Sequence, residues 1–152
     1  MNIYFLHEDP KKCAQYHTDK HVAGMLSVYA TILCNVFHVF IKRALKRRSL
    51  GKEERSQIRA LQSKLPYQPY KLSNKYVSWA KKSGNNFTWL LMMTNFLSME
   101  YRLRFDKVSK TTQAIDILHL LSRDILPEFN PEGVWSNPPL RIDGKKPKYK
   151  LL

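Results

Sequence analysis

The sequence predicts a mainly α-helical protein that folds as a single domain over residues 1–152. Two long segments, residues 10–48 and 74–107, carry apolar side chains at the three- and four-residue spacing of a helix that buries one face. No segment of comparable length alternates apolar and polar side chains as a half-buried strand does. At 43% hydrophobic content the chain can also bury a sizeable core. These observations predict a helical bundle of two long antiparallel helices supported by shorter ones.

The first long helix is predicted from a start signal near the N-terminus. Asp9 is a favourable N-cap residue and Pro10 suits the first helical position, so the helix is expected to run from about residue 10 to about residue 48. Before it, the apolar residues 3–6 are expected to form a short strand or an extended arm packed on the core.

A shorter, more polar region follows. Residues 52–64 are expected to form a second helix that is too polar to lie at the centre of the protein. Residues 65–70 are expected to be non-helical, because Pro66 and Pro69 disfavour a helix at the residues before them.

The second long helix is expected to begin after Asn74, a fair N-cap, with an irregularity at residues 84–86. A last amphipathic helix begins at Thr111 or Thr112 and is stopped by Pro127. Residues 127–152 are expected to form a proline-rich, basic C-terminal extension that Trp135 anchors.

Positive charge is the most pronounced compositional feature. The chain has 26 Lys and Arg against 12 Asp and Glu, which gives a formal net charge of +14. Between residues 42 and 59 only Glu53 and Glu54 oppose a dense group of cations. This basic segment contains Lys42, Arg43, Lys46, Arg47, Arg48, Lys52, Arg55 and Arg59, and a second group, Lys145, Lys146, Lys148 and Lys150, lies in the tail.

Such charge clusters predict a polyanionic partner. Counterion release lets them bind the phosphates of DNA or RNA with little sequence preference, and DNA is the expected partner. Tyr67 and Tyr70 follow the basic segment, where they could stack on unpaired bases or pack over the core. The alternatives are a solvated charged surface without a ligand, an acidic membrane surface, or an acidic protein partner.

Several motifs give the chain a resemblance to a family of small proteins encoded by phages and large DNA viruses. The residues that carry it are Asp9-Pro10, Ala14-Gln15, His17, Asp19-Lys20-His21-Val22, Met25, Trp79-Ala80, Ser83, Asn86-Phe87, Trp89-Leu90, Glu100-Tyr101, Arg104-Phe105 and Lys107. The family has no settled activity, although some members are labelled pyrimidine-dimer DNA glycosylases. The resemblance therefore implies a viral protein that acts on DNA, with base processing as its enzymatic version.

The chain departs from that family pattern in two places. Ser73-Asn74 stands where the family has His-Pro, and Ser109-Lys110 stands where it has His-Lys. Residues 42–70 resemble an insertion special to this protein. If the missing histidines serve the family's chemistry, this chain lacks that chemistry.

Polar side chains fall on the inward stripes of both long helices. The predicted first helix places Cys13, His17 and His21 on one face. The second stripe contains Trp79, Ser83, Asn86, Leu90, Met93, Leu97, Glu100 and Arg104. Glu100 and Arg104 are spaced for an ion pair. Few apolar helices carry such polar groups inward, so the cluster is the candidate for chemistry.

Three interpretations of this cluster remain open at this point. In the first, His17 and His21 hold a zinc ion, with Cys13, Asp19 or His7 as a further ligand, although the principal expectation is a protein without a cofactor.

In the second interpretation the cluster is a metal-free catalytic site. The candidate catalytic residues are His17, Asp19, Lys20, His21, Glu100 and Arg104, and the candidate pocket residues are Tyr16, Trp79, Asn86 and Trp89. A glycosylase needs a carboxylate to stabilise an oxocarbenium-like sugar, often an amine to capture it, and an aromatic wall for a flipped base. In the third interpretation the same groups form a satisfied polar network that joins two helices.

Two classes of function follow. The leading one is a virus- or phage-encoded basic nucleic-acid-binding protein with N-glycosylase-like chemistry as its catalytic version. The alternative is a non-catalytic structural protein, either a minor capsid or virion component that contacts other viral proteins or a DNA-condensing factor.

The expected location is inside the infected host cell, in the cytoplasm or nucleus, or in the virion. Cys13 and Cys34 would lie roughly 30 Å apart on one helix and could not pair, which suits a reducing compartment. Neither a secretion signal nor an uninterrupted apolar run of membrane-spanning length is seen, so secretion and membrane insertion are not expected.

Overall fold

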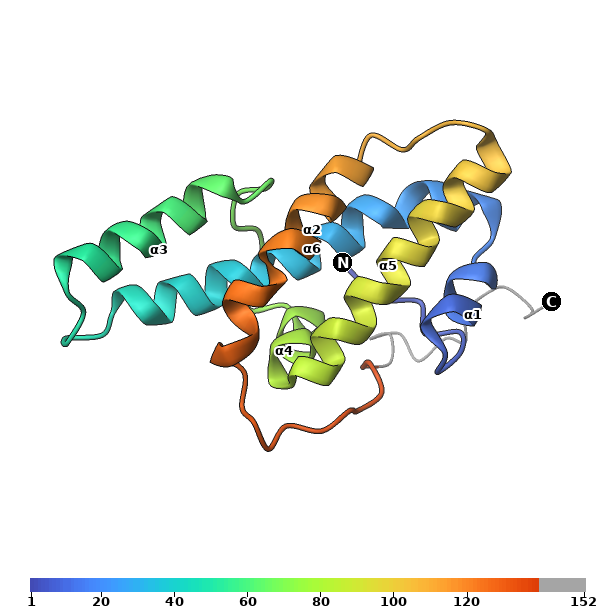
Figure 1. Ribbon diagram of the computed structural model, residues 1–152. Coiled ribbons are helices and arrows are strands. Elements are labelled where there is room, and N and C mark those ends of the chain that lie inside the picture. The colour runs from blue at the N-terminus through green and yellow to red at the C-terminus, as the bar shows by residue number, and fades with distance from the viewer. Residues whose placement is uncertain (140–152) are drawn as a thin grey trace.

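The computed structural model describes residues 1–139, and that part of the chain is helical with no strand assigned (Figure 1). The prediction of a mainly α single domain is confirmed. The helices are α1 (Pro10–Gln15), α2 (Asp19–Leu45), α3 (Lys52–Lys64), α4 (Lys75–Lys82), α5 (Gly84–Phe105) and α6 (Thr112–Ile125), followed by the 3-10 turn η1 (Leu126–Glu128). The tail lysines predicted to bind anions lie outside the described residues.

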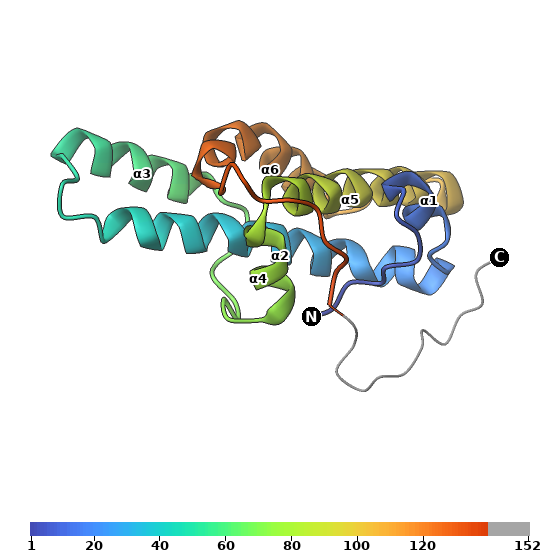
Figure 2. The same cartoon turned by 90° about the horizontal axis from the view of Figure 1, so that it is seen from below.

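Helix α2 is the centre of the fold. Figure 2 shows it with α5 and α6 on one side and α4 on the other. Its core-facing side chains are buried from Val22 to Ala44. By length and composition α2 could cross a membrane, but 72% of its apolar window is buried inside the protein. Most of this apolar surface is therefore covered by the helices that pack on α2, which are α3, α4, α5 and α6.

The predicted helix over residues 10–48 is wrong in one respect, because it is two helices. Asp9 caps α1 as expected, accepting hydrogen bonds from the N–H groups of Lys11 and Lys12. The chain then leaves the helix after Gln15, and the side chain of Thr18 caps a new helix by accepting from the N–H of His21. Residues Cys13, His17 and His21 consequently do not share one helical stripe.

The segment before α1 is an extended arm rather than a strand. Ile3 and Leu6 are buried in the core, and the backbone N–H of Tyr4 donates to the hydroxyl of Tyr29 at 3.2 Å. The arm therefore lies against α2 and contributes side chains to the core without pairing in a sheet.

The second long segment is also divided, at the irregularity that the sequence predicted. Asn74 caps α4 by accepting from the N–H of Tyr76. Ser83 then caps α5 by accepting from the N–H of Asn86, so the chain changes direction between the two helices (Figure 1). Helix α6 begins after Thr111, whose side chain makes no capping hydrogen bond, and Pro127 lies in the turn that ends it.

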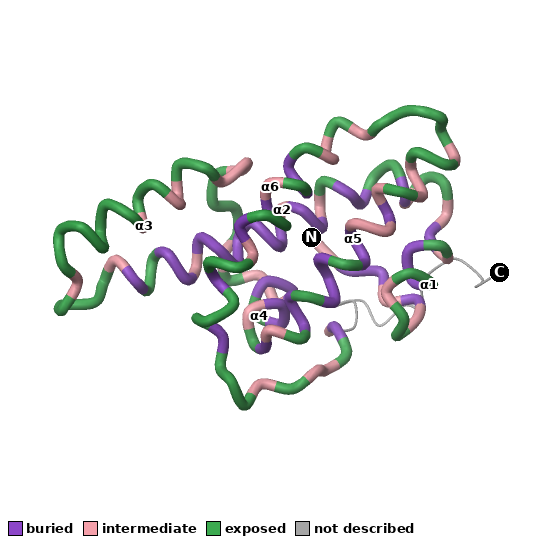
Figure 3. Tube along the Cα trace, viewed as in Figure 1, coloured by how far each residue is buried: buried purple, intermediate pink, exposed green. Residues whose placement is uncertain are grey.

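Helix α3 has the bounds that the sequence predicted and no buried residue. It runs back along the second half of α2, and the two form a helical hairpin that projects from the rest of the protein (Figures 1 and 2). Figure 3 shows α3 exposed along almost its whole length. The hairpin is thus a surface feature attached to the core helix.

Candidate functional site

Arg104 is the centre of the polar cluster between the first two helices and α5. Its Nε donates to the Oε2 of Glu100 at 3.0 Å, as the i, i+4 spacing predicted, and its Nη1 donates to the Oδ1 of Asp19 at 3.1 Å. The same guanidinium also donates to the backbone carbonyls of His17, at 2.6 Å, and Gln15, at 2.8 Å. Arg104 therefore binds the junction between α1 and α2 to α5.

The four contacts of Arg104 stabilise the folded structure. The carbonyls of Gln15 and His17 lie where the helix is broken, so their intrahelical donors are missing and Arg104 replaces them. The carboxylate of Glu100 is only 17% exposed and that of Asp19 is 76% exposed. This guanidinium is thus engaged in holding the helix junction, which is the arrangement of a structural polar network.

His17 is buried and both of its ring nitrogens are hydrogen-bonded. Nδ1 lies 2.7 Å from the carbonyl of Cys13, which can only accept, so Nδ1 carries the proton. Nε2 therefore accepts from the hydroxyl of Tyr29 at 2.7 Å. Burial lowers the pKa of His17 to about 4, so the ring is neutral at pH 7. A neutral, doubly bonded imidazole has no nitrogen left for a substrate or a metal ion.

The depressed pKa of His17 predicts that stability falls on acidification. The unfolded ring, with a pKa near 6.5, takes up a proton while the folded ring does not, so stability present above pH 6.5 is lost towards pH 4. Between pH 7 and pH 5 the free energy of unfolding should fall by about 2 kcal/mol from this residue. Denaturant titrations at both pH values measure the loss, and His17→Gln should abolish most of it. An unchanged pH dependence in that variant contradicts the assignment.

The other two predicted catalytic residues of the first helices are His21 and Lys20. His21 is half-buried, with its Nδ1 2.6 Å from the Thr18 hydroxyl and its ring stacked edge-on against Tyr4 at 4.6 Å. Lys20 is exposed. The structure therefore assembles His17, Asp19, Glu100 and Arg104 around the helix junction but does not bring Lys20 into the same network.

The residues proposed as zinc ligands do not fit a metal ion. Burial raises the pKa of the Cys13 thiol to about 11, and its Sγ donates to the carbonyl of Tyr4. The Nδ1 of His7 accepts from the N–H of Asp9. Within residues 1–139, no three His, Cys, Asp or Glu side chains gather in a way that could hold a metal.

The tryptophans predicted as a pocket wall pack on one another instead. Trp79, Trp89 and Trp135 are in mutual ring contact, with centroids 5.3–6.2 Å apart, and Phe5 of the arm joins them. Trp79 donates to the carbonyl of Ser136, and Trp89 donates to that of Glu8. Their rings and N–H groups thus form part of the core, and the predicted anchoring by Trp135 is confirmed.

Asn86 and Tyr16, the other two candidate pocket residues, also make contacts within the protein. The amide of Asn86 donates to the carbonyl of Trp79 and to the hydroxyl of Ser136, and its oxygen accepts from the N–H of Ser136. Tyr16 is half-buried, edge-on to the ring of His7. Asn86 therefore fastens the segment after α6 to α4 and α5, which sequence reasoning did not foresee.

All eight cations of the basic segment are exposed. Lys42 and Arg43 belong to the last turn of α2, Lys46, Arg47 and Arg48 follow it, and Lys52, Arg55 and Arg59 lie on α3. Among these eight cations, Arg47 alone forms an ion pair with a carboxylate of residues 1–139, with Glu128 at 2.9 Å. The hairpin of α2 and α3 therefore carries a concentrated excess of positive charge, which Glu53 and Glu54 offset only in part.

The loop with the two candidate tyrosines is fastened to α2. Asn35 accepts from the N–H of Tyr70 and donates to its carbonyl, and the Nε2 of His38 donates to the carbonyl of Tyr67 at 2.7 Å. The ring of Tyr70 is 52% exposed, and the Lys71 ammonium lies over it at 5.1 Å from the ring centroid. Tyr67 is half-buried and its hydroxyl bonds to Thr111, and burial raises its pKa.

Sequence reasoning missed the polar residues that hold this loop. Asn35 and His38 are buried within the apolar stretch of α2. A buried polar side chain must find a partner, so their presence in an apolar helix was a signal that a loop backbone crosses it.

Sequence reasoning also missed two cations of α4. Lys81 and Lys82 line a pocket together with Arg43 of α2. Their positions in the sequence did not predict a shared pocket with Arg43, because α3 and the loop after it separate α2 from α4 in the chain.

The chain was compared with protein-family models, with curated proteins and with solved structures, and none of them matches it. The function must therefore be argued from the residues and their geometry.

Proposed function

We propose that this protein binds nucleic acid through its phosphates, with the hairpin of α2 and α3 as the main contact surface and DNA as the partner. The observation that carries the proposal is the exposure of eight cations on one projecting hairpin, of which Arg47 alone is neutralised by a carboxylate within residues 1–139. Ordered phosphates replace diffuse counterions at such a surface, and the released ions drive binding. The net charge of +14 adds long-range attraction.

In the proposed binding mode the protein recognises the charge of the phosphates rather than the base sequence. The exposed face of α3 presents mostly Lys, Arg, Glu, Gln and Ser side chains, and flexible cations on a helical hairpin can follow a phosphate backbone of any sequence. Tyr70 and Lys71 would add a stacking contact for an unpaired base.

The polar cluster supports a structural role more strongly than a catalytic one. A base-excising enzyme needs a carboxylate or an imidazole that is free to act on the substrate. Here His17 is neutral with both nitrogens bonded, and the guanidinium of Arg104 bonds to two carboxylates and two carbonyls. The proposal therefore assigns binding to the hairpin and no reaction to the cluster.

Salt dependence tests the proposal. The affinity for a labelled DNA duplex, measured by fluorescence anisotropy, should fall steeply as salt rises, with a slope of log K against log salt of about −5 to −7 for six to eight phosphate contacts. Duplexes of scrambled sequence should bind equally well, and an RNA duplex of the same length shows whether DNA is preferred. Absence of binding at low salt, or an affinity that salt does not change, contradicts the proposal.

A further inference from the structure

A basic pocket lies where the second half of α2, the end of α4 and the segment after α6 meet. Its volume is about 540 Å³. Arg43 lines it from α2, and Lys81 and Lys82 line it from the last turn of α4. The three cations therefore come from two helices that are distant in sequence and share one cavity.

The charge of these cations is not compensated within the pocket. Glu128 is the one carboxylate among the residues that line it, and Glu128 is already paired with Arg47 at 2.9 Å. Arg43 and Lys81 line the same cavity and repel each other, and burial together with the neighbouring Arg43 guanidinium lowers the pKa of Lys81. An anion placed between them would relieve that repulsion.

The opposite wall of the pocket is fixed in place. Phe129 is buried edge-on against Phe40, with ring centroids 4.9 Å apart. Gly133 brings the following turn against the end of α4, since a Cβ there would lie 2.9 Å from the Cβ of Ser83 and 3.2 Å from the carbonyl oxygen of Lys82. Asn130 closes this turn by accepting from the N–H of Glu132. The pocket is thus shaped before any ligand arrives.

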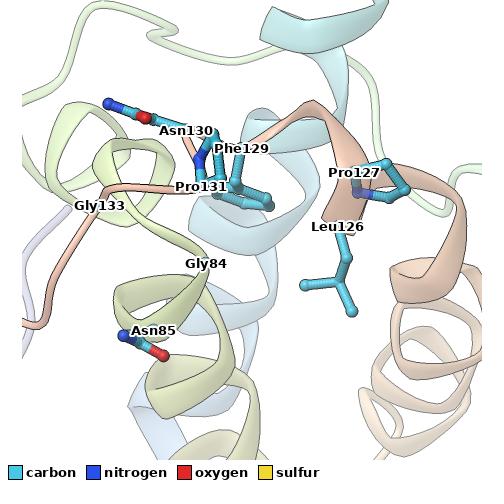
Figure 4. A pocket seen from close by; sticks show the side chains of 8 residues that line it. All are labelled: Gly84, Asn85, Leu126, Pro127, Phe129, Asn130, Pro131 and Gly133. Atoms are coloured by element: carbon cyan, nitrogen blue, oxygen red, sulfur yellow. The ribbon is translucent and has the colours of Figure 1, made fainter.

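A neighbouring hollow provides a contrast. It has a volume of about 340 Å³ and shares Phe129, Asn130 and Pro131 with the basic pocket (Figure 4). Its lining contains no charged side chain. The concentration of cations is therefore specific to the pocket between α2 and α4 and does not extend to the whole segment.

We propose that the pocket formed by Arg43, Lys81 and Lys82 binds a phosphomonoester, the group found at the 5′ end of a nucleic-acid strand and on a free nucleotide. Three cations in one cavity match a dianion better than the single charge of an internal phosphodiester. The volume exceeds that of a phosphate, and the apolar wall of Phe40, Phe129 and Pro131 can pack against the attached sugar or base. The strand-end version of this inference rests on the proposed nucleic-acid binding.

Two ligands separate the pocket from the hairpin. Inorganic phosphate and adenosine 5′-monophosphate, titrated by NMR, should shift the amide signals of residues 78–83 and 128–133 and leave those of α3 unchanged. A 5′-phosphorylated single-stranded oligonucleotide should bind at least about ten-fold more tightly than the same strand with a 5′ hydroxyl. Adenosine monophosphate binding without an end preference would assign the pocket to free nucleotides.

A matched pair of variants decides the matter. Lys81→Gln with Lys82→Gln should abolish the phosphate-induced shifts and the preference for the phosphorylated end, while binding of 5′-hydroxyl DNA persists. Lys11→Gln with Lys12→Gln, an equal change of charge at exposed positions on α1, should keep both. Melting curves verify that each variant is folded. The inference is overturned if wild-type protein shows no shift in the pocket with either ligand, or if the lysine variant keeps the shifts. A failure of DNA binding alone would instead overturn the proposed function.

Discussion

Reversing Lys46, Arg48, Lys52 and Arg59 to glutamate is expected to weaken DNA binding about 1000-fold at physiological salt. All four side chains are exposed on the hairpin, and none pairs with a carboxylate within residues 1–139. Each lost phosphate contact removes the release of roughly one counterion, and each new carboxylate repels the backbone. Fluorescence anisotropy with a DNA duplex measures the affinity, and the salt dependence should become shallower by about four units of slope.

The control for this experiment changes the same net charge at the other end of the molecule. Lys11, Lys12, Lys107 and Lys110 are exposed on α1 and after α5, remote from the tip of the hairpin (Figure 1). Their reversal to glutamate should reduce affinity by less than about ten-fold, through long-range attraction alone. An equal loss in both variants would show that net charge, and not the hairpin, governs binding.

Replacing Arg104 with alanine is expected to lower the free energy of unfolding by about 3 to 5 kcal/mol. The change leaves the largely buried carboxylate of Glu100 without its cation, and it removes the donors to the carbonyls of Gln15 and His17. The melting temperature should fall by about 10 °C or more. Denaturant titration gives the free energy directly, and Arg102→Ala, an exposed position two residues away, should cost less than about 0.5 kcal/mol.

The same variants distinguish a structural cluster from a catalytic one. Arg104→Lys should recover only part of the stability, because an ammonium cannot reproduce the planar fork of four contacts. Glu100→Gln should also melt earlier than the wild type. If Arg104→Ala kept its stability and instead lost release of bases from damaged DNA, the structural interpretation would be wrong and the catalytic one correct.

The elements that the sequence predicted correctly are those with local signals. The caps at Asp9 and Asn74 are encoded within two or three residues of the helices they begin. The bounds of α3 follow from Gly51 before it and Pro66 after it. No contact between residues distant in sequence was needed to place these boundaries.

The break between α1 and α2 has one local signal, the N-cap residue Thr18, which does not by itself end the helix before it. Residues 16–18 contain neither proline nor glycine, and a continuous helix would have satisfied the carbonyls of Gln15 and His17 internally. In the folded protein these two carbonyls accept hydrogen bonds from Arg104, which lies 89 residues after Gln15 and 87 residues after His17 in the chain. A contact between residues that are so distant in sequence leaves no local pattern. It could be predicted only after α5 had been placed beside the junction, where the two free carbonyls require a donor.

The candidate sites differ in the same respect, since some consist of residues close in sequence and others are assembled only by the fold. The basic segment was visible in composition because its members are consecutive in the chain, and the structure places them all on the surface. Trp79 was predicted to face inward, Trp89 to line a pocket and Trp135 to anchor the C-terminal extension, but only the fold shows that the three rings pack on one another. The basic pocket was invisible because Arg43 and Lys81 meet only after α4 packs on α2.

The cluster of three tryptophans has a consequence for how the protein is made. Phe5 contacts Trp89 and Trp135, so one aromatic cluster joins a side chain from the first ten residues to one after residue 130. During translation Phe5 leaves the ribosome long before Trp135, which lies about 130 residues later in the chain, so the ring that completes the packing of Phe5 emerges much later. The hairpin of α2 and α3 can form early from nearby residues, whereas closure of this aromatic cluster must wait until Trp135 has been made.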